Sequence, residues 1–369
     1  MFKKLFQNKS VVKTIRNIGI LLLILLVVSN IVRLMLPFYW GDATQTVKYE
    51  YYEKHKEQYN AVYIGGSLEY RHINPRIIDS IAQKNGLDFH SFNLGIDGHG
   101  IIQEMRDLDG LLEIENPNLK YIFFSISSEV YFFKANLHTP KWVSWQSAPT
   151  MLDALKILPS LNDPLKYRTK MSAFWISSWV ENIFNIGTVP DMLKFYLDKS
   201  YLDSSYVGKN KDGHYPYDYE EYHLFMEYKW EDTLLLESRH RFEKGDPYTD
   251  TMNNQILRSF EQYKPDTKPN KAMVDLCMNA YKKCAKKGIQ LIFMLPPKAR
   301  TSYDLLLPVF NAMPEGTKIS LADIRKYPKF YSIEYGYNFH HLNEKGANLL
   351  SEEFAKQLVP LLKSQLQIN

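Results

Sequence analysis

The chain is poor in cysteine: Cys277 and Cys284 are the only two among 369 residues. They lie seven positions apart within a helical pattern. This spacing puts them on one face of a helix, two turns apart, which is too far for a disulfide. Neither cysteine belongs to a pattern typical of zinc or redox sites. We therefore expect both to be core residues.

The sequence also lacks a strong charge imbalance and any phosphate-binding glycine motif. Its net charge of +4 is small for this length, which argues against a nucleic-acid partner. No P-loop or Rossmann glycine pattern is present, and no group of His, Asp and Glu has metal-ligand spacing. We therefore expect no cofactor and no metal.

Long hydrophobic runs are scarce, and the N-terminus holds the one that is long enough to span a bilayer. Residues 17–32 carry no charge. Arg33 could snorkel to the interface, and the aromatic residues near Trp40 resemble an interfacial belt. With this extension past Arg33 to the region near Trp40, the segment reaches about the 20 residues that are needed to span a bilayer. The flank before the run is basic and has no acid, with Lys3, Lys4, Lys9, Lys13 and Arg16.

This basic flank predicts a single-pass protein of the cytoplasmic membrane, with the N-terminus in the cytoplasm and the rest outside. A cleaved signal peptide is the alternative, but no small-residue cleavage site follows the run. The predicted organisation is a cytoplasmic tail (1–16), a transmembrane signal-anchor helix (17–40), a polar stalk (41–57) and a folded domain (58–369).

Within the folded domain, buried-looking strands alternate with helices over 58–129 and again over 270–369. Such alternation predicts an α/β fold with a parallel sheet covered on both faces. Between these parts, about 130–268, the alternation stops and five of the six tryptophans occur. This stretch is too long for a simple loop, and we expect a mainly helical or irregular insertion.

The first strand ends in an unusual sequence, Gly65-Gly66-Ser67, just before a predicted helix. Two glycines permit a tight turn and a close approach. A serine there would lie at the carboxyl edge of a parallel sheet, where sites form. His341, just before the last predicted helix, can reach the same edge. Taken singly, Ser67 also fits a helix cap, and His341 an ordinary loop residue.

Three blocks stand in the order found in the SGNH (GDSL-like) hydrolases: "YIGGSLEYRHINP", "FNLGIDGHG" and "NFHHLNEKGA". They resemble that family's nucleophile block, its oxyanion-hole glycine block and its histidine block. The similarity is closest to the membrane-anchored branch that includes DltD and the proteins that O-acetylate exported polysaccharides. The resemblance covers 58–129 and 270–369 and implies a three-layer α/β/α sandwich.

The resemblance also implies site residues. Ser67 would be the nucleophile and His341 its general base, and the amides of Ser67 and Gly95 would stabilise an oxyanion. Two positions depart from the family. Asn338 stands where an aspartate usually orients the histidine, so the site is a weaker dyad, or Glu334 substitutes, or the site is inactive. The oxyanion asparagine is missing after the third strand, where Ser127 or Ser128 could donate instead.

Other residues near these blocks could contact substrate: His99 and Asp97 beside Gly95, and Lys298 and Arg300 after "FMLPP". The alternative for the last two is a solvated basic loop. The function implied by the resemblance is acyl transfer or ester hydrolysis on acetyl or D-alanyl groups of a cell-surface polysaccharide or teichoic acid. It also implies a partner, a membrane-bound O-acyltransferase of the MBOAT type. A silent scaffold and a lone membrane-surface esterase or lipase remain alternatives.

Overall fold

The computed structural model describes residues 9–127, 138–228, 233–245, 247–299 and 302–366. The chain divides into two compact units, which are described separately. The anchor unit comprises residues 1–42, 132–155 and 163–201. The sheet unit comprises residues 43–131, 156–162 and 202–369.

The sheet unit is built on five parallel strands in the order β2-β1-β3-β4-β5. Their bounds are β1 Ala61–Ile64, β2 Ser91–Asn93, β3 Tyr121–Ser125, β4 Gln290–Leu295 and β5 Lys318–Ser320. The three central strands are buried along almost their whole length, as parallel strands covered on both faces are. The prediction of a mixed α/β fold with a parallel sheet is confirmed. This order is one of the two common ones in doubly wound sheets, and it changes direction between β1 and β3.

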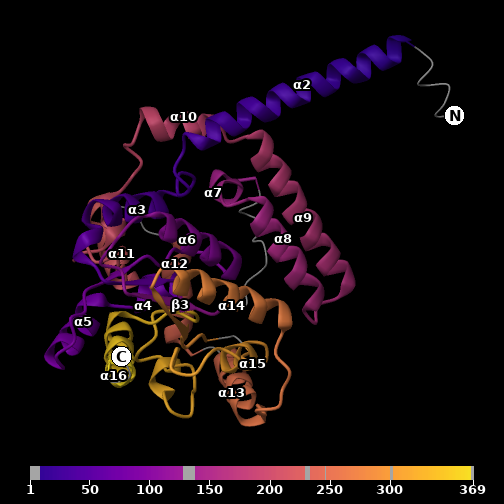
Figure 1. Ribbon diagram of the computed structural model, residues 1–369. Coiled ribbons are helices and arrows are strands. Elements are labelled where there is room, and N and C mark those ends of the chain that lie inside the picture. The colour runs from indigo at the N-terminus through magenta and orange to yellow at the C-terminus, as the bar shows by residue number, and fades with distance from the viewer. Residues whose placement is uncertain (1–8, 128–137, 229–232, 246, 300–301, 367–369) are drawn as a thin grey trace. The chain divides into compact units, whose positions relative to one another are not determined.

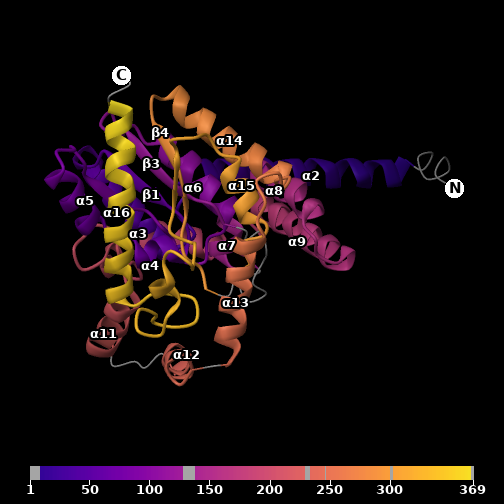
Figure 2. The same cartoon turned by 90° about the horizontal axis from the view of Figure 1, so that it is seen from below.

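Helices flank this sheet on two sides (Figure 2). On one side lie α5 Pro75–Lys84 and α16 Glu344–Leu366, and on the other lie α6 Ile101–Glu113 and α14 Lys271–Lys286. The boundaries follow local sequence signals. The Asn270 side chain accepts a hydrogen bond from the Met273 amide at the start of α14, and Pro75 occupies the first turn of α5. Cys277 and Cys284 on α14 are buried and unbonded, as expected.

The segment expected to be a polar stalk is instead structured. Residues Ala43–His55 form helix α3, followed by the short η1 helix Lys56–Gln58. One face of α3 is buried in the sheet unit, although its composition is polar. Its polar side chains find partners there: Gln45 Nε2 donates to Asp107 at 2.5 Å, and Lys48 Nζ donates to the carbonyl oxygens of Gly95 and Gly213 at 2.6 and 2.9 Å. Buried hydrogen bonds of this kind leave no hydrophobic pattern in the sequence.

The stretch expected as an insertion is mainly helical where the structure describes it, with irregular segments such as 208–216, and it contributes to both units. The anchor unit takes α7 Pro140–Ser144, α9 Leu165–Phe184 and α10 Val189–Leu197. The sheet unit takes η4 Ser204–Val207, α11 Tyr217–Tyr228, α12 Thr233–Glu243 and α13 Pro247–Gln262. Helix α8, Ala148–Ile157, belongs to the anchor unit up to residue 155, and η3, Leu158–Ser160, belongs to the sheet unit.

The anchor unit contains α2, Lys9–Leu34, the long helix drawn in indigo in Figure 1. Its mean hydropathy reaches 2.3, and by length and composition it can cross a membrane. It is the one such helix in the part of the chain that the structure describes. The other short elements of the sheet unit are α4 Ser67–His72, α15 Leu306–Asn311 and η5 Pro328–Tyr331.

Candidate active site

Ser67 and His341, which are 274 residues apart in sequence, meet at the carboxyl edge of the sheet. Ser67 is the first residue of α4, directly after β1 and the two glycines. His341 lies in the loop that leads into α16, and α16 packs against both α4 and α5. The Ser67 Oγ lies 3.0 Å from the His341 Nε2. This distance is within the hydrogen-bond reach that a nucleophile and its general base require.

Asn338 occupies the third position of this arrangement. Its Oδ1 lies 3.2 Å from the Nδ1 of His341 and also accepts hydrogen bonds from the backbone amides of His340 and His341, at 2.9 and 3.0 Å. An amide oxygen can only accept, so Nδ1 donates and Nε2 is left to take the proton of Ser67. Asn338 therefore orients the ring and fixes its tautomer, but supplies no negative charge.

The surroundings of His341 favour the neutral imidazole. Burial lowers its pKa well below the ordinary value, and the nearby Arg71, His340 and Lys298 act in the same direction. Glu334, considered as a substitute acid, is ion-paired with Lys345 instead. The imidazole is thus available as a base at neutral pH, but its protonated form lacks a compensating charge.

Two aromatic rings lie close to the His341 ring. The Tyr217 ring from α11 lies edge-on, with centroids 4.8 Å apart. The His72 ring lies 5.8 Å away at 72°, and its Nε2 accepts a hydrogen bond from the Leu342 amide at 2.9 Å. Burial lowers the pKa of His72 well below its ordinary value, so it remains neutral and able to accept. His72 therefore secures the histidine loop to α4.

Neighbouring atoms leave no room for a side chain at Gly65 or Gly66. A Cβ at Gly65 would lie 2.1 Å from the Glu69 Oε2, and a Cβ at Gly66 would lie 2.7 Å from the His99 carbonyl oxygen. The Glu104 Oε1 would also be 3.5 Å from a Cβ at Gly66. The glycines thus let the turn that carries Ser67 approach two buried carboxyl groups and the backbone of the Gly95 loop.

Glu69 and Glu104 are buried, and their charges act on each other and on the partly buried Lys298. Burial raises the pKa of Glu69 to about 7. Burial, together with the charge of Glu69, raises the pKa of Glu104 well above its ordinary value. Burial lowers the pKa of Lys298 to about 8, although both carboxyl groups oppose this shift. Lys298 is partly buried and lies within electrostatic reach of both carboxyl groups.

Two of the expected oxyanion-hole donors, Gly95 and Ser127, are engaged within the protein. The Gly95 amide donates to the Asn93 Oδ1 at 2.8 Å, and the Ser127 hydroxyl donates to the Glu104 Oε2 at 3.0 Å. Each donor must give up this bond before it can stabilise an oxyanion. Ser128, the other serine considered, lies outside the described residues.

The remaining predicted contact residues lie in different surroundings. His99 is buried, and its Nδ1 lies 2.6 Å from the Asp107 Oδ2, so it has little surface for a substrate. Asp97 is half-exposed and pairs with Arg71 at 3.5 Å. Arg300 lies outside the described residues.

The role of Arg71 is not apparent from the sequence, where a solvated first turn fits this residue as well as a pocket position does. Its guanidinium is buried and pairs with Glu220 of α11 at 2.5 Å. It also lies 4.1 Å from the Tyr217 ring centroid and 4.6 Å from that of Tyr70. The only sequence signal is the unusual number of tyrosines near residue 217. Arg71 therefore joins the nucleophile helix α4 to α11.

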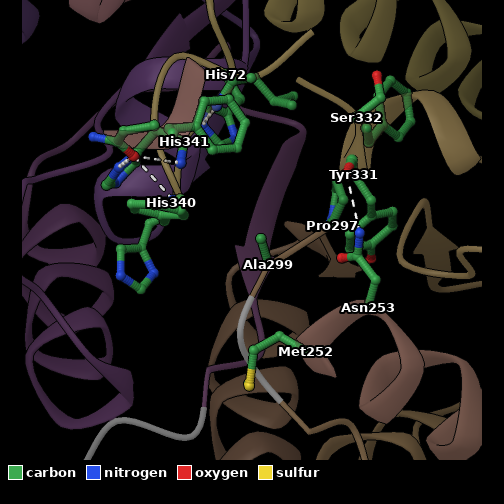
Figure 3. Close-up of a pocket in the computed structure, with 15 residues that line it drawn as sticks. His72, Met252, Asn253, Pro297, Ala299, Tyr331, Ser332, His340 and His341 are labelled. Atoms are coloured by element: carbon green, nitrogen blue, oxygen red, sulfur yellow. Dashed lines mark hydrogen bonds between the residues drawn. The ribbon is translucent and has the colours of Figure 1, made fainter. Parts of the chain in front are cut away.

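A narrow pocket adjoins His341 (Figure 3). His72, His340 and His341 line one side of it, and Pro297, Tyr331 and Asn253 line the other. Its cavity volume is about 20 Å³, which is room for about one water molecule. The lining is mainly apolar and aromatic, with Phe242, Met252, Phe330 and Phe339 among its residues. Only a small group could enter without movement of the walls.

The fold and the site together define an α/β protein with a Ser–His pair, oriented by an asparagine, at the carboxyl edge of a parallel sheet. Comparison with known protein families finds no model that matches the chain, and no curated protein matches it.

Proposed function

We propose that this chain is a membrane-anchored extracytoplasmic serine acyltransferase or esterase of the SGNH type. Its substrate would be an O-acyl group, acetyl or D-alanyl, on a cell-surface polysaccharide or teichoic acid. The observation that carries the proposal is the 3.0 Å contact between Ser67 Oγ and His341 Nε2, with Asn338 on the other ring nitrogen. The five-stranded parallel sheet with helices on both sides also supports the proposal.

The chemistry that this geometry supports has two steps. The Ser67 oxygen attacks the acyl carbonyl carbon while His341 Nε2 takes the hydroxyl proton. The leaving alcohol then takes that proton as its bond to the acyl carbon breaks, and an acyl-serine ester remains. In the second step, water or a glycan hydroxyl attacks this ester and passes its proton through His341, which restores Ser67.

The proposal is tested on the full-length chain in detergent with a fluorophosphonate probe and with p-nitrophenyl acetate. We expect Ser67 to be labelled and the ester to be hydrolysed. Ser67→Ala should abolish both, and His341→Ala should reduce both strongly. The matched control is Ser364→Ala, because Ser364 is an exposed serine in the last turn of α16, at the end of that helix opposite to His341. Loss of labelling in this control as well would contradict the assignment to Ser67.

A catalytically silent scaffold is the second candidate, and Asn338 is the observation that favours it. Without a carboxylate, the imidazolium has no charge partner. A folded wild-type chain that neither takes the label nor hydrolyses the ester would support the scaffold. Co-purification with a multi-pass O-acyltransferase would then distinguish a component of a transfer assembly from an esterase that works alone.

A further inference from the structure

The anchor unit exposes an apolar surface on α9 and α10. Ile176 and Val180 on α9, Ile186 in the connecting turn, and Val189, Leu193 and Leu197 on α10 are all exposed, Leu197 by 82%. We call these six residues the α9–α10 face. The opposite face of α9 is the packed one, with Met171, Trp175, Ser178 and Asn182 buried.

The charge pattern of this region is not that of a water-facing helix. Between residues 171 and 190 the sole charged residue is Glu181, and the His138 Nδ1 lies 2.6 Å from its carboxylate. A helix on the surface of a soluble protein normally carries charged residues opposite its buried face. Lys166, Arg168 and Lys170 lie in the first two turns of α9. From Ser172 onward its outer face carries alanine, serine and branched apolar residues instead.

Hydrogen bonds place this face beside the end of the candidate spanning helix. The Asn185 side chain donates to the Ser29 carbonyl oxygen at 3.0 Å, and Arg33 donates to the Asn182 Oδ1 at 2.5 Å. Both partners lie on α2, just where its uncharged run ends. The end of α9 is therefore at the same level as the end of the apolar run.

Helix α10 is joined to the chain that follows α2. The Tyr196 hydroxyl donates to the Met35 carbonyl oxygen. Met192 and Phe195 pack with Leu36 and Trp40 in one buried cluster. In Figure 1, α10 lies beside the C-terminal end of α2. The exposed residues of α10 thus lie near residues 35–40, where an aromatic belt was expected.

We propose that the α9–α10 face lies in the interfacial region of the phospholipid bilayer that α2 spans. Its branched side chains would enter the boundary between headgroups and acyl chains, as those of interfacial helices do. Lys194 and Lys199 are exposed on and just after α10, and their charge suits anionic headgroups. The occupant of the face is lipid, and the anchor is a spanning helix with an interfacial platform around its outer end.

The test uses the full-length chain in liposomes of phosphatidylcholine with a minority of phosphatidylglycerol. An environment-sensitive NBD fluorophore is attached at Leu193→Cys or, independently, at Val189→Cys. The wild type, treated with the same fluorophore, measures labelling at sites other than the introduced cysteine. We expect this labelling to be weak, because both native cysteines are buried. We expect blue-shifted emission at both positions, quenching by lipids with a spin label near the headgroup, and protection from aqueous iodide.

Two further positions make the result decisive. Glu352→Cys on the exposed side of α16 should be quenched by iodide and not by spin-labelled lipid. Ile24→Cys within α2 should be quenched by a deeply placed spin label. Iodide quenching at Leu193 and Val189 as strong as at Glu352, with Ile24 still in lipid, would overturn the interfacial face and leave the anchor standing. Protection that occurs in native membranes but not in these liposomes would assign the face to a protein partner and also overturn the proposal.

Discussion

Asn338 is the residue on which the chemistry of the candidate site depends most. Its oxygen accepts from two backbone amides and lies against the imidazole Nδ1. It therefore orients the imidazole as a triad aspartate does. What it cannot do is stabilise the imidazolium that forms when Ser67 gives up its proton. The consequence is a base that is correctly oriented but electrostatically weak.

We predict that Asn338→Asp raises turnover of a p-nitrophenyl ester. In a serine protease, replacing the triad aspartate by asparagine lowers turnover about 10⁴-fold, so the reverse change should act in the opposite direction, and we expect a gain of about tenfold or more. The new carboxylate should also raise the pKa of His341 and move the acidic limb of the pH–rate profile to higher pH. Glu334→Gln is the control, since its partner is Lys345, and it should leave the rate unchanged.

Glu69 gives a prediction about stability. Its pKa is raised to about 7 in the folded protein from an ordinary value of 4.5. Between these values the folded state holds more protons than the unfolded state, so the free energy of unfolding falls as pH rises through this window. Glu69→Gln should remove this fall in the free energy of unfolding, because glutamine does not titrate. We expect the variant to gain about 3 kcal/mol relative to wild type as the pH rises from about 4 to about 8.

Urea unfolding at several pH values measures this effect. A Glu57→Gln control, on the exposed η1 helix, should follow the wild-type profile. Parallel profiles for wild type and Glu69→Gln would show that Glu69 titrates normally in the fold and would contradict the prediction.

At the scale of elements, the turn between β1 and α4 is the most constrained connection of the site. We predict that Gly66→Ala costs about 1–3 kcal/mol, because its Cβ would lie 2.7 Å from the His99 carbonyl oxygen. It should also abolish fluorophosphonate labelling by displacing Ser67. Gly316→Ala is a useful comparison, since its φ of +73° strains an alanine while nothing lies within 4 Å. That variant should lose stability but keep labelling.

The ion pair between α4 and α11 provides a second test at this scale. Arg71→Met would leave Glu220 in a partly buried place without its partner, at a cost of about 3–5 kcal/mol. Glu220→Gln should cost less, and the double variant should recover part of the loss in a thermodynamic cycle. Additive losses, together with unchanged amide exchange in α11, would show that Arg71 does not hold this helix.

The helices and strands that could be predicted from the sequence are those with a regular pattern of apolar residues. All five strands and the helices that cover them follow from runs of apolar residues and from cap signals such as Asn270 and Pro75. Helix α3 could not be predicted, because its buried face consists of Gln45, Thr46, Lys48 and two tyrosines. Gln45 and Lys48 are buried there because residues distant in sequence accept their hydrogen bonds. The Ser67–His341 contact was expected from the sequence blocks. The buried carboxyl groups of Glu69 and Glu104 were not, since no local pattern marks a carboxylate as buried.

At the scale of the whole molecule, the orientation in the membrane is the main prediction. The basic residues before α2 predict an N-terminus in the cytoplasm. A reporter fused at Asn369 should be active when its activity depends on export and silent when it depends on the cytoplasm. Replacing Lys9, Lys13 and Arg16 by glutamine should weaken this preference. The opposite reporter pattern in the wild type would show that the sheet unit is cytoplasmic.

The early position of α3 has a consequence for how far the proposed enzyme can work from its membrane. Helix α2 ends at Leu34 and α3 begins at Ala43, and fully extended chain between them spans at most about 30 Å. Lys48, little more than one turn into α3, already contacts the backbone of the Gly95 loop. The protein thus has no long tether. The proposed acyl exchange would therefore take place on glycan close to the bilayer surface, and not on polymer far out in the cell envelope.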